Sequence, residues 1–338
     1  MGMTQQTIQL GRRPKGTPTY EDFNFVEAPI GSPDKGEVLV RTVYISVDPY
    51  LRGRMNEGKS YIPPFEVGEV ISSAVIAQVE KSNSDRFSEG DVVIGSLGWQ
   101  EYSVVKDNEV RKVDHHQAPA SAYLSVLGMT GLTAYFGLLD IGKPKEGETV
   151  VVSGAAGAVG SVVGQIAKLK GARVVGIAGS DEKTSYLKDT LGFDATINYK
   201  TEDIAQALKD ACPDGIDVYF ENVGGEVGDA VFPLLNNFAR IPVCGAISSY
   251  NNTEPDLGPR VQGYLIKTSS LMQGFTVGNY SSRFKEGAEA LAGWLSEGKL
   301  TYEETITEGF DHTIDAFLDL FKGANTGKAV VKVSEIQE

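Results

Sequence analysis

Three glycines at the end of a short apolar run are the residues of this chain best suited to binding a nucleotide. The run Thr149–Ser153 predicts a buried strand, and Gly154, Gly157 and Gly160 follow it before an amphipathic stretch over residues 158–170. In such a motif one glycine permits a tight turn, one lets the backbone approach a pyrophosphate, and one lets the helix pack against the strand. The N–H groups of the helix's first turn would then face the phosphates. The spacing predicts a dinucleotide site.

The end of the next predicted strand, 173–178, distinguishes between the two nicotinamide cofactors. An NAD site carries a carboxylate there for the ribose 2′-hydroxyl, whereas this chain has Ala178, Gly179 and Ser180. Lys183 lies one turn into a predicted helix over 181–191 and can form a charge-assisted bond with a 2′-phosphate, worth about 1.5–3 kcal/mol. The same spacing also fits a solvated lysine on a helix surface. We therefore expect NADPH rather than NADH.

The elements that position these residues change in character along the chain. Up to about residue 125, short β-branched runs broken by Gly and Pro predict a β-rich domain. Apolar strands and helical patterns then alternate, which predicts a doubly wound parallel sheet with helices on both faces. The predicted strands are 38–47, 67–79, 91–94, 99–105, 149–153, 173–178, 195–198, 216–221, 240–244, 270–275 and 328–333, and the predicted helices are 158–170, 181–191, 202–211, 229–235, 260–267, 281–297 and 313–321. We expect two domains, residues 1–125 with 305–338, and residues 126–304.

The composition of the chain limits which partners and metals the protein can bind. A net charge of −14 repels nucleic acid and anionic membranes. No apolar run is long enough to span a membrane and no secretory signal is evident, so we expect a soluble, cytoplasmic protein. Cys212 and Cys244 are far apart, and His115 and His116 are neighbours, so we expect neither a disulfide framework nor a zinc cage.

Seven stretches together carry a resemblance to a known family. They are Val47–Met55, Gly128–Tyr135, Ala155–Lys170, Gly179–Lys183, Asn198–Lys200, Tyr219–Gly225 and Cys244–Tyr250. Over nearly its whole length the chain resembles the zinc-independent medium-chain dehydrogenase/reductases. It is most similar to the leukotriene B4 12-hydroxydehydrogenase / prostaglandin 13-reductase group, which includes bacterial curcumin reductases and plant double-bond reductases. The zinc-dependent branch has an early cysteine and a Gly-His-Glu stretch, where this chain has Ser46–Tyr50 and Gly68-Glu-Val.

The resemblance implies a Rossmann NADP(H)-binding domain, a β-rich GroES-like catalytic domain, and a homodimer. It also implies a set of cofactor contacts. These are Gly157, Ala158, Val159 and Gly160 at the pyrophosphate, Lys183 and Tyr199 at the 2′-phosphate, Asn222 along the cofactor, Cys244, Gly245, Ala246, Ile247, Ser248, Ser249, Tyr250, Phe275, Thr276 and Val277 at the nicotinamide, and Asn325 from the first domain.

The implied reaction moves a hydride from NADPH to the β-carbon of an enone or enal. Negative charge then develops on the carbonyl oxygen and needs a donor. Tyr250 and Tyr50 are the candidate donors, and a merely structural role as pocket walls stays open for each. Two other functions stay open as well. One is quinone reduction within the same superfamily, and the other is NADPH binding without turnover, as in a crystallin-like or regulatory protein.

Overall fold

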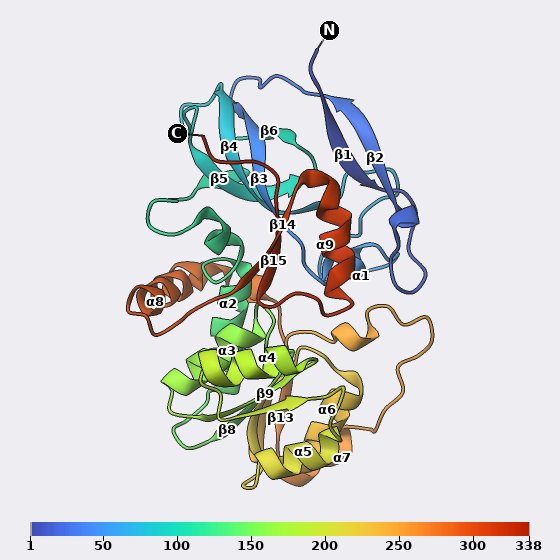
Figure 1. Ribbon diagram of the computed structural model, residues 1–338, viewed down its shortest axis with the longest axis vertical. Coiled ribbons are helices and arrows are strands. Elements are labelled where there is room, and N and C mark those ends of the chain that lie inside the picture. The colour runs from blue at the N-terminus through green and yellow to red at the C-terminus, as the bar shows by residue number, and fades with distance from the viewer. Residues whose placement is uncertain (1, 338) are drawn as a thin grey trace. The chain divides into compact units, whose positions relative to one another are not determined.

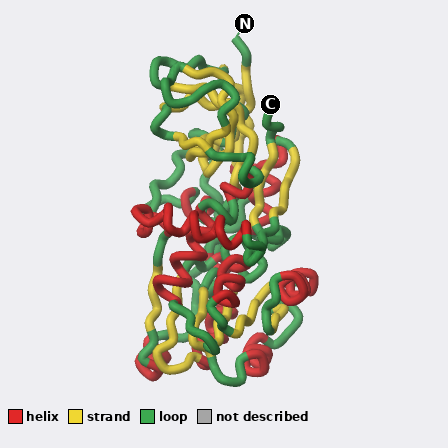
Figure 2. The backbone as a smooth tube through the Cα atoms, turned by 90° about the vertical axis from the view of Figure 1, so that its left-hand side faces the viewer, coloured by secondary structure: helices red, strands yellow, loops and turns green. Residues whose placement is uncertain are grey.

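The computed structural model describes residues 2–337, which divide into two compact units (Figure 1). Within that range, unit 1 contains residues 2–124, 305–325 and 329–337, and unit 2 contains residues 125–304 and 326–328. Figure 2 shows strands dominating unit 1 and helices and strands alternating in unit 2.

The strands are β1 (Thr4–Leu10), β2 (Phe23–Pro29), β3 (Glu37–Ser46), β4 (Ser72–Ser82), β5 (Val92–Gly98), β6 (Tyr102–Lys106), β7 (Val110–Lys112), β8 (Thr149–Ser153), β9 (Arg173–Ala178), β10 (Ala195–Asn198), β11 (Ile216–Phe220), β12 (Leu235–Val243), β13 (Leu271–Gly274), β14 (Glu304–Glu308) and β15 (Lys328–Lys332). The α-helices are α1 (Leu51–Arg54), α2 (Met129–Phe136), α3 (Gly160–Leu169), α4 (Asp181–Ser185), α5 (Ile204–Ala211), α6 (Gly225–Val231), α7 (Gln262–Thr268), α8 (Phe284–Ser296) and α9 (Thr313–Leu320).

Unit 2 is built on a six-stranded parallel sheet in the order β10-β9-β8-β11-β12-β13. The chain moves outward from β8 to β10 and then returns to β11 on the other side of β8. Open α/β sheets bind ligands beyond the carboxyl ends of their strands, at the point where the strand order reverses. The predicted doubly wound sheet of Rossmann type is therefore confirmed.

Helices cover both faces of this sheet. Tyr219 of β11 packs in one cluster with Leu208 of α5 and Val227 of α6. The next residue, Phe220, points to the opposite face because side chains alternate along a strand. There it meets Gly137, which directly follows α2: a Cβ on Gly137 would lie 2.9 Å from the Phe220 ring. Each face of the sheet thus contributes to a separate buried layer.

Unit 1 contains a seven-stranded sheet, in which the strands follow the order β14-β15-β3-β4-β5-β7 and the seventh, β6, pairs with β3. It also contains the separate hairpin β1-β2. Residues from both ends of the sequence share its core. Trp99 lies edge-on to Phe317 of α9, with ring centroids 5.9 Å apart, and Phe23 lies edge-on to the same ring at 6.2 Å. The predicted β-rich domain is confirmed.

Several predicted boundaries are wrong. The strand expected over 67–79 begins only at Ser72, because residues 66–69 form a turn with Gly68 at a φ of +90°. The helix expected over 181–191 changes to a π-helical turn after Ser185. The helix expected over 229–235 starts earlier, at Gly225, and Leu235 already belongs to β12.

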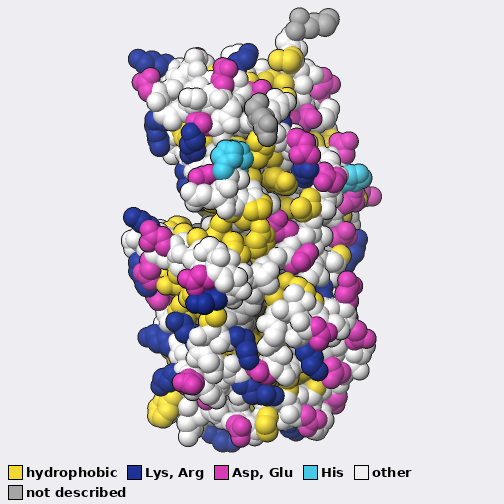
Figure 3. Space-filling view, turned by 60° about the vertical axis from the view of Figure 1, so that its left-hand side comes forward, with side chains coloured by type: hydrophobic (Ala, Val, Ile, Leu, Met, Phe, Trp, Pro, Cys, Tyr) yellow, Lys and Arg dark blue, Asp and Glu magenta, His cyan; other side chains and the backbone are white. Residues whose placement is uncertain are grey.

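The surface carries charges of both signs. On the face drawn in Figure 3, Asp and Glu side chains are spread over both units and interleave with Lys and Arg. Within residues 2–337, no helix combines the length and apolarity that crossing a membrane requires.

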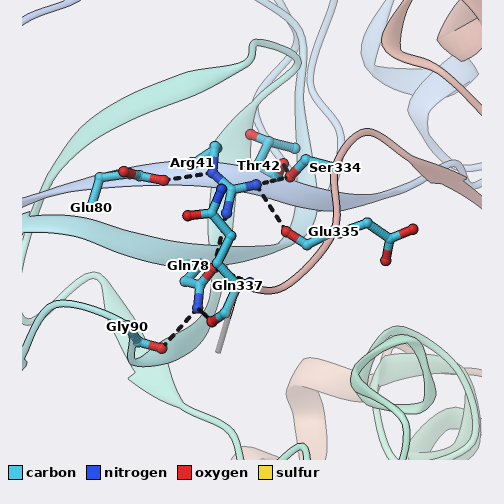
Figure 4. A network of polar contacts seen from close by, with 8 residues as sticks. All are labelled: Arg41, Thr42, Gln78, Glu80, Gly90, Ser334, Glu335 and Gln337. Atoms are coloured by element: carbon cyan, nitrogen blue, oxygen red, sulfur yellow. Dashed lines mark hydrogen bonds and ion pairs between the residues drawn. The ribbon is translucent and has the colours of Figure 1, made fainter.

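Arg41 of β3 binds the C-terminal segment, residues 334–337, to the sheet of unit 1 (Figure 4). Its Nε donates to Glu80 Oε1 at 2.5 Å, its Nη2 to Gln78 Oε1 at 2.9 Å, and its Nη1 to the Glu335 carbonyl at 3.0 Å. Nη1 also donates to the Ser334 hydroxyl. Arg41 is only 9% exposed, so its removal would leave several partly buried acceptors without a donor.

We expect Arg41→Ala to lower the free energy of unfolding of unit 1 by about 2–3 kcal/mol, since charge-assisted bonds at partly buried sites are lost. Urea titration and the rate of proteolysis at residues 334–337 measure the effect. Arg86→Ala is the control. Its side chain is 55% exposed in a surface ion pair, so the change should stay within about 0.5 kcal/mol. Equal effects of the two substitutions would contradict the fastening role.

Candidate cofactor and active site

Every cofactor-site segment expected in unit 2 begins where a parallel strand ends. The final strand residues are Ser153, Ala178, Asn198, Phe220, Val243 and Gly274. Because the strands are parallel, these ends share one edge of the sheet. The structure gathers along it Gly157, Ala158, Val159, Gly160, Lys183, Tyr199, Asn222, Cys244–Tyr250 and Phe275–Val277. Tyr50 and Asn325 belong to unit 1.

The turn between β8 and α3 excludes side chains at Gly160. A Cβ there would lie 2.4 Å from the Gly154 carbonyl oxygen and 2.8 Å from the Ala155 Cα, both backbone atoms. The N–H groups of Ala158 and Val159 donate to no acceptor in the part of the chain that the structure describes. Those two donors, at the start of a ten-residue helix, fit the pyrophosphate of a dinucleotide.

A segment distant in sequence lies against the same turn. The N–H of Gly327 donates to the Ala156 carbonyl at 2.7 Å, and Gly327 forms a parallel bridge with Gly157. Gly327 has a φ of +66°, and a Cβ on it would lie 1.9 Å from the Glu303 carbonyl oxygen. Asn325 precedes Gly327 by two residues in the chain and belongs to unit 1.

Tyr199 lies beside Gly179, where β9 and β10 end, and Lys183 follows Gly179 by four residues in α4. A Cβ on Gly179 would lie 3.2 Å from the Tyr199 hydroxyl. The Ser180 hydroxyl accepts from the Lys183 N–H at 3.3 Å and thereby fixes the first turn of α4. Burial, and secondarily the charge of Lys200, lowers the pKa of Lys183. The residues fit a 2′-phosphate, which would stabilise the protonated lysine.

A buried carboxylate that the sequence analysis missed organises the turn after β11. Glu221 is 4% exposed, and its Oε1 accepts from the N–H groups of Val223 at 2.8 Å and Gly224 at 2.7 Å, and from the Ser153 hydroxyl at 3.0 Å. The Asn222 N–H donates to the same Ser153 hydroxyl at 2.9 Å, and Asn222 Nδ2 donates to the Ser153 carbonyl at 2.8 Å. These bonds hold Asn222 against the end of β8, and its Oδ1 accepts no hydrogen bond from residues 2–337.

Tyr250 folds back over its own loop. A Cβ on Gly245 would lie 2.9 Å from the Tyr250 hydroxyl oxygen, which accepts from the Ala246 N–H at 3.4 Å. Burial raises the pKa of Tyr250, although the Ala246 N–H partly offsets this. The hydroxyl is therefore protonated at neutral pH. Since it acts as acceptor within the loop, its proton is left for another oxygen.

The ring of Phe275 packs against other residues of unit 2. It lies edge-on to Phe220, with centroids 6.2 Å apart, and a Cβ on Gly137 would lie 2.3 Å from it. The backbone N–H donates to the Val243 carbonyl at 3.4 Å. The ring thus positions the β12 end rather than standing free at the site.

In unit 1, Tyr50 precedes α1 and is half-buried. Burial, and secondarily the Asp48 carboxylate, raises the pKa of Tyr50, so this hydroxyl is protonated too. Nearby in the chain, the Arg54 guanidinium lies 3.8 Å above the centre of the Phe65 ring.

Both cysteines should be unreactive in the folded protein. Burial, together with the Glu221 charge, raises the pKa of Cys244 to about 12, and burial raises that of Cys212 to about 11. At pH 8 the nucleophilic thiolate is almost absent from both. We expect a disulfide-exchange reagent to label neither thiol in the native state and both in urea. Because the pKa values of both thiols are raised in the folded protein, burying them in the neutral form stabilises the fold. This contribution to the free energy of unfolding is complete below about pH 8.5 and is lost as the pH rises toward 12. Rapid native labelling at pH 8 would contradict this assignment.

Two family descriptions match the chain. Residues 6–113 match the N-terminal domain of oxidoreductase, and residues 158–293 match the zinc-binding dehydrogenase description.

Relatives match the chain over almost its full length. The NADP-dependent oxidoreductase YfmJ of Bacillus subtilis is 65% identical over 99% of both chains. The NADPH-dependent curcumin reductase of Escherichia coli is 47% identical over 96% of both chains. Prostaglandin reductase 1 of Rattus norvegicus is 44% identical over 97% of this chain and 98% of its own.

A solved structure agrees with the fold. The crystal structure of CurA from Vibrio vulnificus in complex with NADPH has a TM-score of 0.94 and 47% identity, and covers 98% of this chain and 99% of its own. The chain belongs to the zinc-independent medium-chain dehydrogenase/reductases. The resemblance to the group of the prostaglandin and curcumin reductases is thereby confirmed.

This medium-chain reductase is an NADP-dependent oxidoreductase, as the sequence analysis predicted. Two features of the sequence indicate the cofactor, the glycine turn and the missing carboxylate after β9. No sequence feature indicates Glu221, because a carboxylate at the end of an apolar strand is also typical of a surface position.

Proposed function

We propose that this medium-chain reductase uses NADPH to reduce the C=C bond of α,β-unsaturated ketones and aldehydes, with hydride transfer to the β-carbon. The names of its relatives support this substrate class, and one in Nicotiana tabacum is named 2-alkenal reductase (NADP(+)-dependent). The observation that carries the proposal is the Tyr250 hydroxyl, which accepts from the Ala246 N–H and keeps its proton available.

NADPH, when bound, supplies the hydride. Ala158 and Val159 would bind the pyrophosphate, and Lys183 with Tyr199 the 2′-phosphate. Asn222 and the loop Cys244–Tyr250 would hold the nicotinamide end. Tyr250 would donate to the carbonyl oxygen as negative charge develops on it, and Tyr50 is the second candidate donor. Such a donor contributes most when it is already oriented before the reaction.

Absorbance at the NADPH band tests the reaction class. The purified protein is mixed with a 2-alkenal, a quinone or a saturated aldehyde, each with NADPH and with NADH, and the products are identified. We expect oxidation only with the 2-alkenal and NADPH, giving the saturated aldehyde. Turnover of the quinone alone would favour quinone reduction. NADPH binding without turnover of any substrate would favour a non-catalytic role.

We also propose that two copies of this chain pair through β13. This strand is the last of the unit 2 sheet, and Leu271 is 49% exposed on it. An exposed strand edge is satisfied when an identical strand pairs with it around a two-fold axis. Light scattering should give twice 36.3 kDa for the wild type. Gly274→Pro removes a backbone donor from the edge, because the N–H of the next residue, Phe275, points the other way to Val243 of β12. It should give the monomer mass, and a dimer that survives it would exclude this edge.

A further inference from the structure

The Glu221 carboxylate lies where the strand order of the unit 2 sheet reverses. Glu221 directly follows β11, and its Oε1 accepts from the hydroxyl of Ser153, the last residue of β8, at 3.0 Å. The chain moves outward from β8 to β10 and then returns to β11, so β8 and β11 flank the reversal. Dinucleotides cross from one half of an open α/β sheet to the other at this point. The carboxylate is therefore at the crossing.

The two halves of the cofactor can be assigned to the two halves of the sheet. Lys183 and Tyr199, which fit the 2′-phosphate, follow β9 and β10 on one side of β8. The glycine turn, which fits the pyrophosphate, follows β8 itself. The nicotinamide half then extends over β11 and β12, on the other side of β8. The segments that follow these two strands are residues 221–225 and the loop Cys244–Tyr250.

Hydrogen bonds join these two segments at Glu221. The Glu221 carbonyl accepts from the N–H groups of Cys244 at 2.9 Å and Gly245 at 3.2 Å. The next two carbonyl groups accept from the N–H groups of Ile247 at 3.2 Å and Ser248 at 3.0 Å. Burial and, after it, the Glu221 charge raise the pKa of Cys244. The negative charge of Glu221 thus acts on the first residue of the loop.

This carboxylate is buried without a cation beside it. Glu221 is 4% exposed, and a Cβ on Gly228 would lie 2.5 Å from its Oε2, so α6 covers that oxygen. None of residues 2–337 forms an ion pair with Glu221, whose Oε1 accepts from two backbone N–H groups and one hydroxyl. Neutral donors stabilise a carboxylate but leave its net charge in place. Because the group is buried, water and salt screen its field only weakly.

The two redox states of a nicotinamide differ by one positive charge on the ring. Hydride transfer breaks a C–H bond of the reduced ring, and the hydrogen leaves with both bonding electrons to form a C–H bond on the acceptor carbon. The oxidised ring is left with the positive charge. A fixed negative charge near the ring therefore interacts more favourably with the oxidised cofactor than with the reduced one.

We propose that the Glu221 carboxylate stabilises the positive charge of the oxidised nicotinamide and so raises the affinity for NADP⁺ relative to that for NADPH. The same interaction grows as the hydride leaves, so it also favours the transfer. This inference rests on the proposed placement of the nicotinamide beside the loop Cys244–Tyr250. It holds whether the acceptor is an enone or a quinone.

Calorimetric titration of the full chain with NADP⁺, with NADPH and with adenosine 2′,5′-bisphosphate tests the charge. Glu221→Gln keeps the shape and an oxygen acceptor but removes the charge. We expect it to weaken NADP⁺ binding about tenfold, to leave NADPH binding within about threefold, and to leave binding of the bisphosphate, which has no nicotinamide, within about twofold. Glu221→Asp, which keeps the charge, should retain most of the wild-type ratio of the two cofactor affinities.

Glu226→Gln is the matched control, because it removes an exposed carboxylate five residues further along the chain. Solvent screens such a group, so the ratio of the two affinities should not change. In the wild type, the ratio should also stay constant between low and high salt, since the charge is buried. A ratio that fell with salt would assign the effect to exposed carboxylates and would overturn the proposal without any variant.

A purely structural role of Glu221 predicts a different outcome, in which Glu221→Gln weakens both cofactors by the same factor. That result would overturn the proposal, as would an unchanged ratio with unchanged affinities. Asn222→Ala then separates the two assumptions. Weaker binding of both cofactors in Asn222→Ala would leave the nicotinamide where it is placed and reject only the role of the charge. Wild-type binding in that variant would show that the placement is wrong as well.

Discussion

Tyr250→Phe should lower kcat/KM for an enone by about 100-fold or more. Removing one oriented donor to a developing oxyanion costs roughly 2.7–4 kcal/mol. The substitution deletes the one atom whose proton is left free by the Ala246 bond. Because the pKa of Tyr250 is raised, any loss of the wild-type rate from deprotonation of this hydroxyl should come at a higher pH than the value of about 10 at which a free tyrosine titrates. Steady-state kinetics on both sides of this value provide the measurement.

The control for this substitution is Tyr264→Phe. Tyr264 is half-buried in the same unit and stacks on Phe232, with ring centroids 6.1 Å apart. The substitution therefore removes an equivalent hydroxyl group at a position away from the strand ends. It should keep kcat/KM within about twofold, and both variants should bind NADPH as the wild type does. If Tyr250→Phe kept full activity, the donor would have to be sought elsewhere, and Tyr50→Phe would be tested next.

Gly160→Ala should weaken NADPH binding by about 100-fold or more and lower the melting temperature. The added methyl group would lie 2.4 Å from the Gly154 carbonyl oxygen and 2.8 Å from the Ala155 Cα. Neither backbone atom can rotate away, so the turn itself must move, and with it the Ala158 and Val159 donors. Overpacking of this kind costs roughly 1–3 kcal/mol of stability. Cofactor fluorescence and thermal unfolding measure the two effects separately.

Gly293→Ala is the matched control. Gly293 lies inside α8, and a Cβ there would have nothing within 4 Å. Alanine in an open helical position should stabilise the chain by up to about 1 kcal/mol and leave NADPH affinity unchanged. If the two substitutions had the same effect on NADPH binding, close backbone packing at Gly160 would not be the cause.

The central strands of the parallel sheet could be predicted closely from sequence because they are buried on both faces. β8, β9 and β10 begin and end at the predicted residues. The hairpin of β1 and β2 was not predicted, because polar residues occupy core positions in β1. Gln5 is 8% exposed, and its Oε1 accepts from the Tyr102 N–H at 2.7 Å. Only a partner 97 residues away makes glutamine acceptable there, and local sequence does not reveal that partner.

The residues of the candidate site also fall into two groups, those that a local sequence motif can locate and those that it cannot. Gly160 and Lys183 follow their strands at fixed short spacings, so a motif could locate them. Glu221 reaches Ser153 because β11 and β8, although distant in sequence, are neighbours in the sheet. Such roles depend on strand order, which the sequence pattern leaves unspecified.

The two units differ in when each can be completed during synthesis. Unit 2 is almost contiguous, from Ser125 to Glu304, so its sheet can form as soon as that stretch has left the ribosome. Unit 1 must wait, because β15 lies between β14 and β3 and belongs to the last residues made. Until then β3 lacks one of its neighbours and exposes an edge to other nascent chains. A ribosome stalled shortly before Lys328 should therefore display a folded nucleotide-binding unit attached to an unfinished, aggregation-prone one.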